Sequence, residues 1–203
     1  SKKDHELFMS DFLSPSYIQD KFNSWKVLGS YDTQDITFKE ALIIELISKG
    51  IAKKKELDKY DNPLENLHKC INDSKKNLDD TEQNEVSINF YGISDSFKKQ
   101  YFRFLKKKLS KLFAEPIYFQ SVPTFRFHFP NQQGYEWEDR YHTDIMLGHP
   151  PYEFNVWIPF TNVFNSNSMR ITPLEDSLNF LKNTNYDFEL FAKNVQYKED
   201  VIK

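Results

Sequence analysis

At about Pro116 the sequence changes from helical periodicity to short aromatic runs separated by proline, glycine and asparagine. Such runs are typical of antiparallel strands and the turns between them. Residues 124–129 alternate strictly, so three phenylalanines point to one face while Arg126 and His128 point to the other. The second part of the chain is therefore predicted to be built from strands.

A second alternating run, residues 153–159, places Asn155 and Trp157 on one side and apolar side chains on the other. Residues 86–91 form a short apolar and aromatic run that ends at Gly92, and they are predicted to be a further strand. The polar stretch 72–85 is expected to be an exposed loop.

The first half of the chain carries helix signals. Thr37 and Glu40 have the spacing of a capping box, apolar residues recur at helical spacing from Phe38 to Ile47, and Gly50 is placed to end the helix. The sequence thus predicts a helix that begins after Thr37.

Two further helices are expected. One begins near Asn62 and Pro63, because proline suits the first helical position. The other follows Ser94 and carries one apolar stripe: Phe97, Tyr101, Leu105, Leu109 and Leu112. Its opposite face is basic, which we interpret as a solvated surface rather than as a site for a polyanion.

A chain of 203 residues can bury one sizeable core, so we expect one domain over 1–203. Residues 1–115 would be mainly helical support, and 116–203 would form the β core.

The net charge of -3 gives no reason to expect nucleic acid or an anionic membrane as partner. A single cysteine, with neither signal peptide nor membrane span, predicts a cytoplasmic protein that acts on a small molecule.

His142 and Asp144 form a His-x-Asp motif next to a predicted strand, where the period of two puts both side chains on one face. One imidazole and one carboxylate supply two corners of the 2-His-1-carboxylate triad, which holds non-haem Fe(II) and leaves coordination positions open. A 2-oxo acid and O2 can take those positions, so the cofactor supplies the oxidation. Because the motif occurs by chance, its surroundings have to support this interpretation.

The surrounding sequence, residues 141–160 followed by Asn167-Ser168-Met169, resembles the phytanoyl-CoA dioxygenase superfamily, and within it the streptomycin-biosynthesis oxygenase-like branch. The resemblance extends from about Pro123 to Ser177. It implies an α+β fold in which an N-terminal helical layer supports a double-stranded β-helix, the cupin-like jelly roll. It also implies an Fe(II)- and 2-oxoglutarate-dependent dioxygenase that hydroxylates a small polar, possibly carbohydrate-derived, metabolite.

The resemblance assigns roles to individual residues. His142 and Asp144 match the first two iron ligands, Trp157 would flank 2-oxoglutarate, and Arg126 would face the cofactor from the preceding strand. Asn155 shares a face with Trp157, so its amide could bond a carboxylate of cofactor or substrate.

The chain departs from the family in one respect. The only histidine after Asp144 is His149, five residues on, whereas the family draws its third ligand from a distant strand. The arginine that would clamp 2-oxoglutarate should follow that ligand, and the only later arginine is Arg170. Both missing residues are expected beyond Lys203, which would leave the jelly-roll core incomplete at its C-terminus.

Two other functions remain open. One is a non-catalytic jelly-roll protein that keeps the pocket and binds a ligand, and the other is a cupin-type metal hydrolase or isomerase that needs no 2-oxo acid. His128 is interpreted as structural, and His149 as a residue that shapes the loop at the mouth of the site.

Overall fold

The computed structural model describes residues 29–112, 116–132, 142, 144, 149, 153–169, 171–172, 174–185, 187 and 190. The chain divides into two compact units. The first unit holds the described residues between 30 and 132 together with 159–163. The second unit holds the other described residues, including His142, Asp144 and His149.

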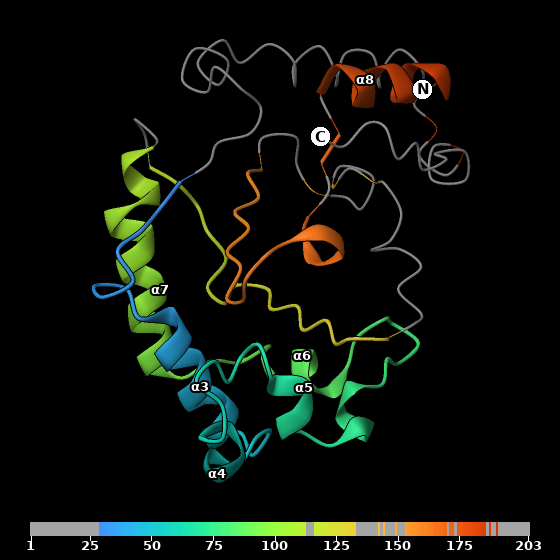
Figure 1. Cartoon of the computed structure of the whole chain (residues 1–203). Helices are drawn as coiled ribbons and strands as arrows, with labels where there is room; N and C mark the ends of the chain where they lie inside the picture. The colour runs from blue at the N-terminus through green and yellow to red at the C-terminus, as the bar shows by residue number, and fades with distance from the viewer. Residues whose placement is uncertain are drawn as a thin grey trace. The chain divides into compact units, whose positions relative to one another are not determined.

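In the part of the chain that the structure describes, the regular elements of both units are helices (Figure 1). The first unit contains α3 (Phe38–Ser48), α4 (Lys54–Leu57), α5 (Leu67–Cys70), α6 (Glu85–Asn89), α7 (Asp95–Lys107) and the 3-10 helices η1 (Asp73–Lys76) and η2 (Leu109–Lys111). The second unit contains the 3-10 helix η4 (Asn165–Asn167) and α8 (Leu174–Asn183).

The prediction of a double-stranded β-helix is wrong for the part of the chain that the structure describes. No β-strand forms across these ranges, and an isolated antiparallel bridge joins Leu78 and Asn84. Alternation predicts which side chains share a face, but a strand exists only where its backbone pairs with a neighbouring strand. Residues 124–129 and 153–159 lack this pairing, so the jelly-roll and cupin-like assignment is withdrawn.

The backbone of residues 124–129 bonds to side chains instead. The amide of Phe127 donates to Ser87 Oγ at 3.2 Å, and its carbonyl accepts from Asn84 Nδ2 at 2.6 Å. The amide of Phe129 donates to Gln132 Oε1 at 3.1 Å. These bonds satisfy polar groups that would otherwise need a neighbouring strand.

The predicted strand at residues 86–91 is also wrong, because the short helix α6 begins at Glu85. Asn84 caps this helix, since its side chain accepts a hydrogen bond from Ser87 N at 2.9 Å. Asn84 and Glu85 are typical helix-start residues, and this signal outweighs the apolar run that follows them.

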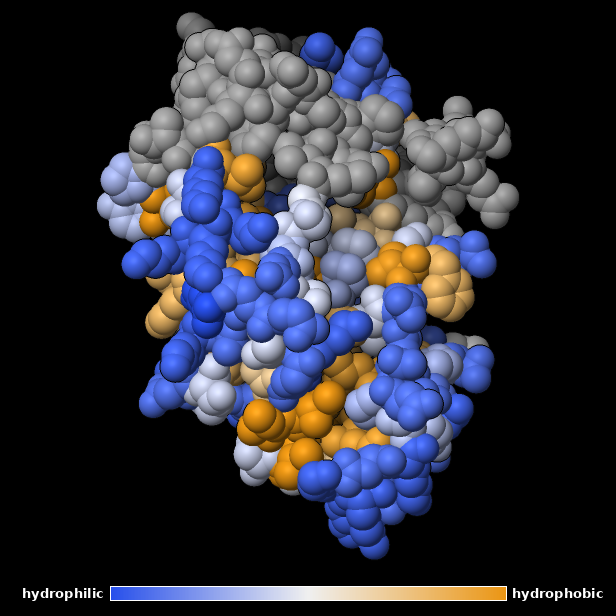
Figure 2. Space-filling view, turned by 60° about the vertical axis from the view of Figure 1, so that its left-hand side comes forward, coloured by the Kyte–Doolittle hydropathy of each residue, from blue (hydrophilic) through white to orange (hydrophobic). Residues whose placement is uncertain are grey.

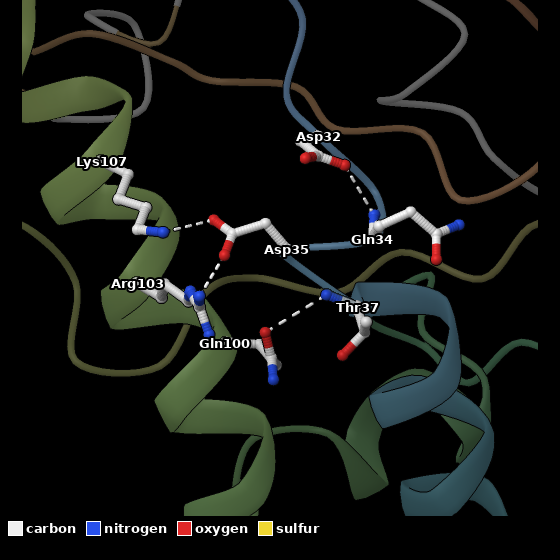
Figure 3. A network of polar contacts seen from close by, with 7 residues as sticks. All are labelled: Asp32, Gln34, Asp35, Thr37, Gln100, Arg103 and Lys107. Carbon is white, nitrogen blue, oxygen red and sulfur yellow. Dashed lines mark hydrogen bonds and ion pairs between the residues drawn. The ribbon is translucent and has the colours of Figure 1, made fainter.

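Helix α3 confirms the helix predicted after Thr37. It ends at Ser48, and Gly50 has a φ of +65°, the left-handed conformation expected just past a helix end. The predicted capping box is wrong, because the Thr37 side chain makes no capping hydrogen bond. The Thr37 amide instead donates to Gln100 Oε1 on α7 at 3.2 Å (Figure 3).

Helix α7 confirms the helix predicted after Ser94. The Ser94 hydroxyl caps it by accepting from Phe97 N at 3.3 Å. The helix ends at Lys107, so Leu109 and Leu112 of the predicted stripe lie beyond it, and Phe104 joins the buried side chains. The apolar stripe is thus shorter than its periodicity predicts.

Helices α3 and α7 pack side by side (Figure 1), and a buried carboxylate joins them. Glu45 of α3 is only 2% exposed, and its Oε1 accepts from Ser94 N at 2.7 Å. Lys49 Nζ lies 3.7 Å from the other oxygen of Glu45 and donates to the Gly92 carbonyl at 2.7 Å. The start of α7 is therefore held by α3 through a paired charge, as a buried carboxylate requires.

Phenylalanine rings fill the core of the first unit. The Phe38 ring on α3 lies 5.6 Å from Phe97, 5.6 Å from Phe104 and 5.7 Å from Phe160, measured between centroids. Such distances are typical of aromatic pairs that contribute beyond their buried area. Phe160 belongs to the segment 159–163, so a residue late in the chain completes this core.

The face assignment of residues 124–129 is confirmed even though no strand forms. The rings of Phe125 and Phe127 contact Phe90 at 4.7 and 5.0 Å. Arg126 and His128 are exposed. Extended backbone alternates its side chains with or without a partner strand.

Figure 3 shows how α7 anchors the segment that precedes α3. Asp35 pairs with Arg103 and accepts a hydrogen bond from Lys107 Nζ at 2.6 Å. The hydrogen bond from Lys107, together with the nearby charge of Arg103, holds the pKa of Asp35 below its ordinary value of 3.8. Part of the basic face of α7 therefore pairs within the unit rather than with solvent.

We expect this network to make stability depend on pH. Because the pKa of Asp35 is lowered in the folded state, its contribution is present above about pH 3.8 and is lost as the pH falls through the lowered value. Urea unfolding of Asp35→Asn should show a weaker loss of stability in acid than the unchanged protein. Asp61→Asn, at an exposed position, is the control and should keep the full dependence.

Figure 2 brings forward the side of the first unit on which α3 and α7 lie in Figure 1. Hydrophilic side chains cover much of this face, with apolar patches between them. Among the described helices, none combines the length and the apolar composition that a membrane span needs.

Candidate functional site

His142 and Asp144 lie together in the second unit. Nε2 of His142 is 3.8 Å from Oδ1 of Asp144, and their side chains are 32% and 34% exposed. Asp144 lies in a 3-10 turn and not in a strand. The structure thus brings the two predicted ligands together in a site that solvent can reach.

The two oxygens of the Asp144 carboxylate have different surroundings. Oδ1 faces His142, while Oδ2 accepts a hydrogen bond from the side-chain amide of Asn155. The main-chain carbonyl of Asp144 accepts from the His149 amide at 3.1 Å. Asn155 therefore contacts a predicted metal ligand, whereas the sequence predicted a contact with cofactor or substrate.

His149 and Glu153, which lie between Asp144 and Asn155 in the sequence, contact each other. Nδ1 of His149 lies 2.8 Å from Oε1 of Glu153, within hydrogen-bond distance. The role of His149 at the mouth of the site stays a prediction. Sequence analysis missed Glu153, although alternation places it on the same face as Asn155 and Trp157.

The remaining predicted site residues are less closely connected. Trp157 belongs to the second unit and is 48% exposed. Arg126 is exposed in the first unit, as is His128. A contact of Arg126 with the cofactor stays a prediction.

The metal centre needs a correction. Within the residues that the structure describes, no three or more His, Cys, Asp and Glu side chains are grouped as a metal site requires. Within these ranges the His142–Asp144 pair supplies two of the three donors that a facial triad needs. Its donor chemistry still fits a metal centre, because imidazole nitrogen and carboxylate oxygen each bind a metal at about 2.0–2.2 Å. One ion could reach both atoms across 3.8 Å.

Comparison with known proteins gives one partial match. A segment of 58 residues is 34% identical to the streptomycin biosynthesis protein StrG of Streptomyces griseus, and it covers 29% of this chain and 28% of that protein. No family model matches the chain, and no solved structure matches it. The similarity to a biosynthesis protein is thus local, and membership of the phytanoyl-CoA dioxygenase superfamily is not shown.

Proposed function

We propose that this chain is an Fe(II)- and 2-oxoglutarate-dependent oxygenase that acts on a small polar metabolite, with His142 and Asp144 as two of the iron ligands. The observation that supports this most directly is the 3.8 Å separation of His142 Nε2 and Asp144 Oδ1. Local similarity to a streptomycin biosynthesis protein is consistent with a substrate of this class.

The composition of the pair is compatible with iron. One imidazole and one carboxylate are the beginning of the facial triad of Fe(II) oxygenases, whereas structural zinc sites use four ligands and are rich in cysteine. The one cysteine, Cys70, is buried in the first unit and its Sγ bonds the carbonyls of Glu56 and Asn66.

Three residues of the second unit have a role in this proposal: His142, Asp144 and Trp157. Fe(II) and the 2-oxo acid, when bound, supply the oxidising chemistry. His142 and Asp144 hold the ion, and the half-exposed indole of Trp157 offers an apolar surface against which the 2-oxo acid can lie.

A second candidate is a ligand-binding protein without catalysis. It is favoured by the lack of a third metal donor beside His142 and Asp144 within the described ranges. A metal-dependent hydrolase or isomerase is the other alternative, and it would bind the metal but have no need of 2-oxoglutarate.

Anaerobic absorbance separates these three functions. We expect a weak visible charge-transfer band when both Fe(II) and 2-oxoglutarate are added to the chain, and none with either alone. Succinate in place of 2-oxoglutarate is the control, because it lacks the oxo group that chelates iron. Metal binding without the band would favour the hydrolase or isomerase, and no metal binding would favour the non-catalytic protein.

A further inference from the structure

We propose that one side of α7 is a docking surface for a separate acidic protein, which presents apolar side chains flanked by carboxylates. The docking surface consists of Lys99, Phe102 and Lys106 on the helix, together with Phe119 from the segment that packs against it. This inference goes beyond the proposed function and does not depend on the metal site. It changes the interpretation of the basic face of α7, which the sequence alone indicated to be a solvated surface.

Most of the other basic side chains of α7 are paired within the first unit. Arg103 and Lys107 both pair with Asp35, so they face the segment that precedes α3 (Figure 3). At the start of the helix, Lys98 Nζ lies 3.7 Å from Asp95 Oδ1. The charges of these three basic residues are therefore compensated by carboxylates of the same unit.

Lys99 and Lys106 differ from them, because they are exposed and frame an aromatic ring. They lie three residues before and four residues after Phe102, a spacing that places all three side chains on one side of an α-helix. Within the part of the chain that the structure describes, neither ammonium group takes part in an ion pair or a hydrogen bond. Two uncompensated positive charges thus flank an exposed ring.

Two aromatic rings form the apolar centre of the docking surface. Phe102 is 44% exposed and Phe119 is 50% exposed, and their ring centroids are 5.8 Å apart. The Tyr101 hydroxyl donates to the Gln120 carbonyl at 3.0 Å, and the Tyr101 ring lies 6.3 Å from that of Phe119. These contacts hold the rings in place before a partner binds, so little conformational entropy is lost on binding.

The chemistry of the surface indicates the chemistry of its partner. An apolar centre with a polar rim is the usual arrangement of a protein–protein interface, and aromatic residues are enriched at such centres. A rim of lysines selects a partner that carries carboxylates at the matching positions. The complementary surface is therefore apolar in the middle and acidic around it, as on one side of an acidic amphipathic helix.

The charge of the whole chain favours a protein over a polyanion. The net charge is -3, so an extended anionic partner, such as nucleic acid or an anionic membrane, would meet repulsion from the rest of the surface. Charges separated by more than about 8–10 Å are largely screened at physiological ionic strength. A protein with a small acidic patch would thus interact mainly with Lys99 and Lys106.

The probe for this surface is a fluorescein-labelled synthetic helix of about 18 residues, long enough to form a helix by itself, with a leucine stripe flanked by glutamates. We expect Phe102→Ala to weaken its binding about tenfold, as for an aromatic residue at the centre of an interface. Lys99→Gln/Lys106→Gln should weaken it about fivefold, because exposed charge pairs each contribute little. Fluorescence anisotropy measures the affinities, and circular dichroism verifies that the variants fold.

A second probe, with glutamine in place of every glutamate, tests the charge pairing. The unchanged protein should bind it about fivefold more weakly than the first probe. Lys99→Gln/Lys106→Gln should bind both probes equally, because the same pairs are missing in either case. The matched controls are Lys39→Gln/Lys55→Gln and Ile44→Ala, all at exposed positions of α3 and α4, and they should bind the first probe as the unchanged protein does.

No binding of the glutamate probe, or equal binding by the unchanged protein and the double lysine variant, would overturn the proposal. Oligothymidylate or phosphatidylserine vesicles that bind through Lys99 and Lys106 in place of the probe would identify a nucleic acid or a membrane instead. Self-association in sedimentation velocity that Phe102→Ala abolishes would identify a second copy of this chain. Each of these results contradicts an acidic protein partner and leaves the proposed function standing.

Discussion

His142→Ala and Asp144→Ala are each expected to weaken Fe(II) binding by more than about 100-fold. Loss of a residue outside the coordination sphere typically costs about 10–100-fold, and loss of a ligand should exceed this. Anaerobic equilibrium dialysis with Fe(II) measures the change directly. Both variants should also lose the band that Fe(II) and 2-oxoglutarate produce together.

His128→Ala is the matched control for the histidine, since His128 is exposed in the first unit. Its Fe(II) affinity should stay within about twofold, an estimate based on the small effect of surface substitutions. If His142→Ala and His128→Ala reduced the Fe(II) affinity equally, the loss would be unspecific. His142 and Asp144 would then not be the metal ligands.

Phe38→Ala is expected to lower the free energy of unfolding by about 3–5 kcal/mol, the usual cost of removing a buried phenylalanine. Phe38 is 2% exposed. Its ring contacts four aromatic side chains that lie outside α3: Tyr31, Phe97, Phe104 and Phe160. Alanine would leave a cavity among rings that cannot all move inward. Urea unfolding followed by circular dichroism gives the change.

Phe102→Ala is the comparison for this experiment, because Phe102 lies on α7 and is 44% exposed. Its ring contacts Phe119 at 5.8 Å, so we expect a loss of about 1 kcal/mol. Similar losses in the two variants would contradict the position of Phe38 at the centre of the core.

The helices that sequence analysis predicted correctly are those with strong local signals. Helix α7 combines a Ser94 cap with a long apolar stripe, and α3 ends before Gly50, whose positive φ suits glycine. Both signals act between residues that are neighbours along the chain. Such local preferences can be predicted without knowledge of the rest of the fold.

The predicted strands failed because strand formation depends on distant residues. Alternation in residues 124–129 correctly separated buried Phe125 from exposed Arg126, yet it contained no information about a partner. In residues 86–91 a local signal was misjudged. Asn84, which caps α6, is a helix-start signal in the sequence, but the apolar run after it was given more weight.

Part of the candidate site was predictable because its signal is local in the sequence. The spacing of His142 and Asp144 indicated two adjacent donors, and the structure brings them together. The contact of Asn155 with Asp144 and the pairing of His149 with Glu153 depend on the path of the loop between them. Periodicity describes faces of an element, and it does not describe the path of a loop.

The position of Phe160 has a consequence for how the protein is made. Its ring lies in the core of the first unit, 5.7 Å from Phe38, and the amide of Asn162 donates to Glu65 in the same unit. A ribosome adds residues in order, so α3 and α7 emerge well before the segment 159–163 that completes their core. Aromatic side chains of the first unit therefore stay exposed until that segment leaves the ribosome. During this interval the nascent chain can bind chaperones or aggregate.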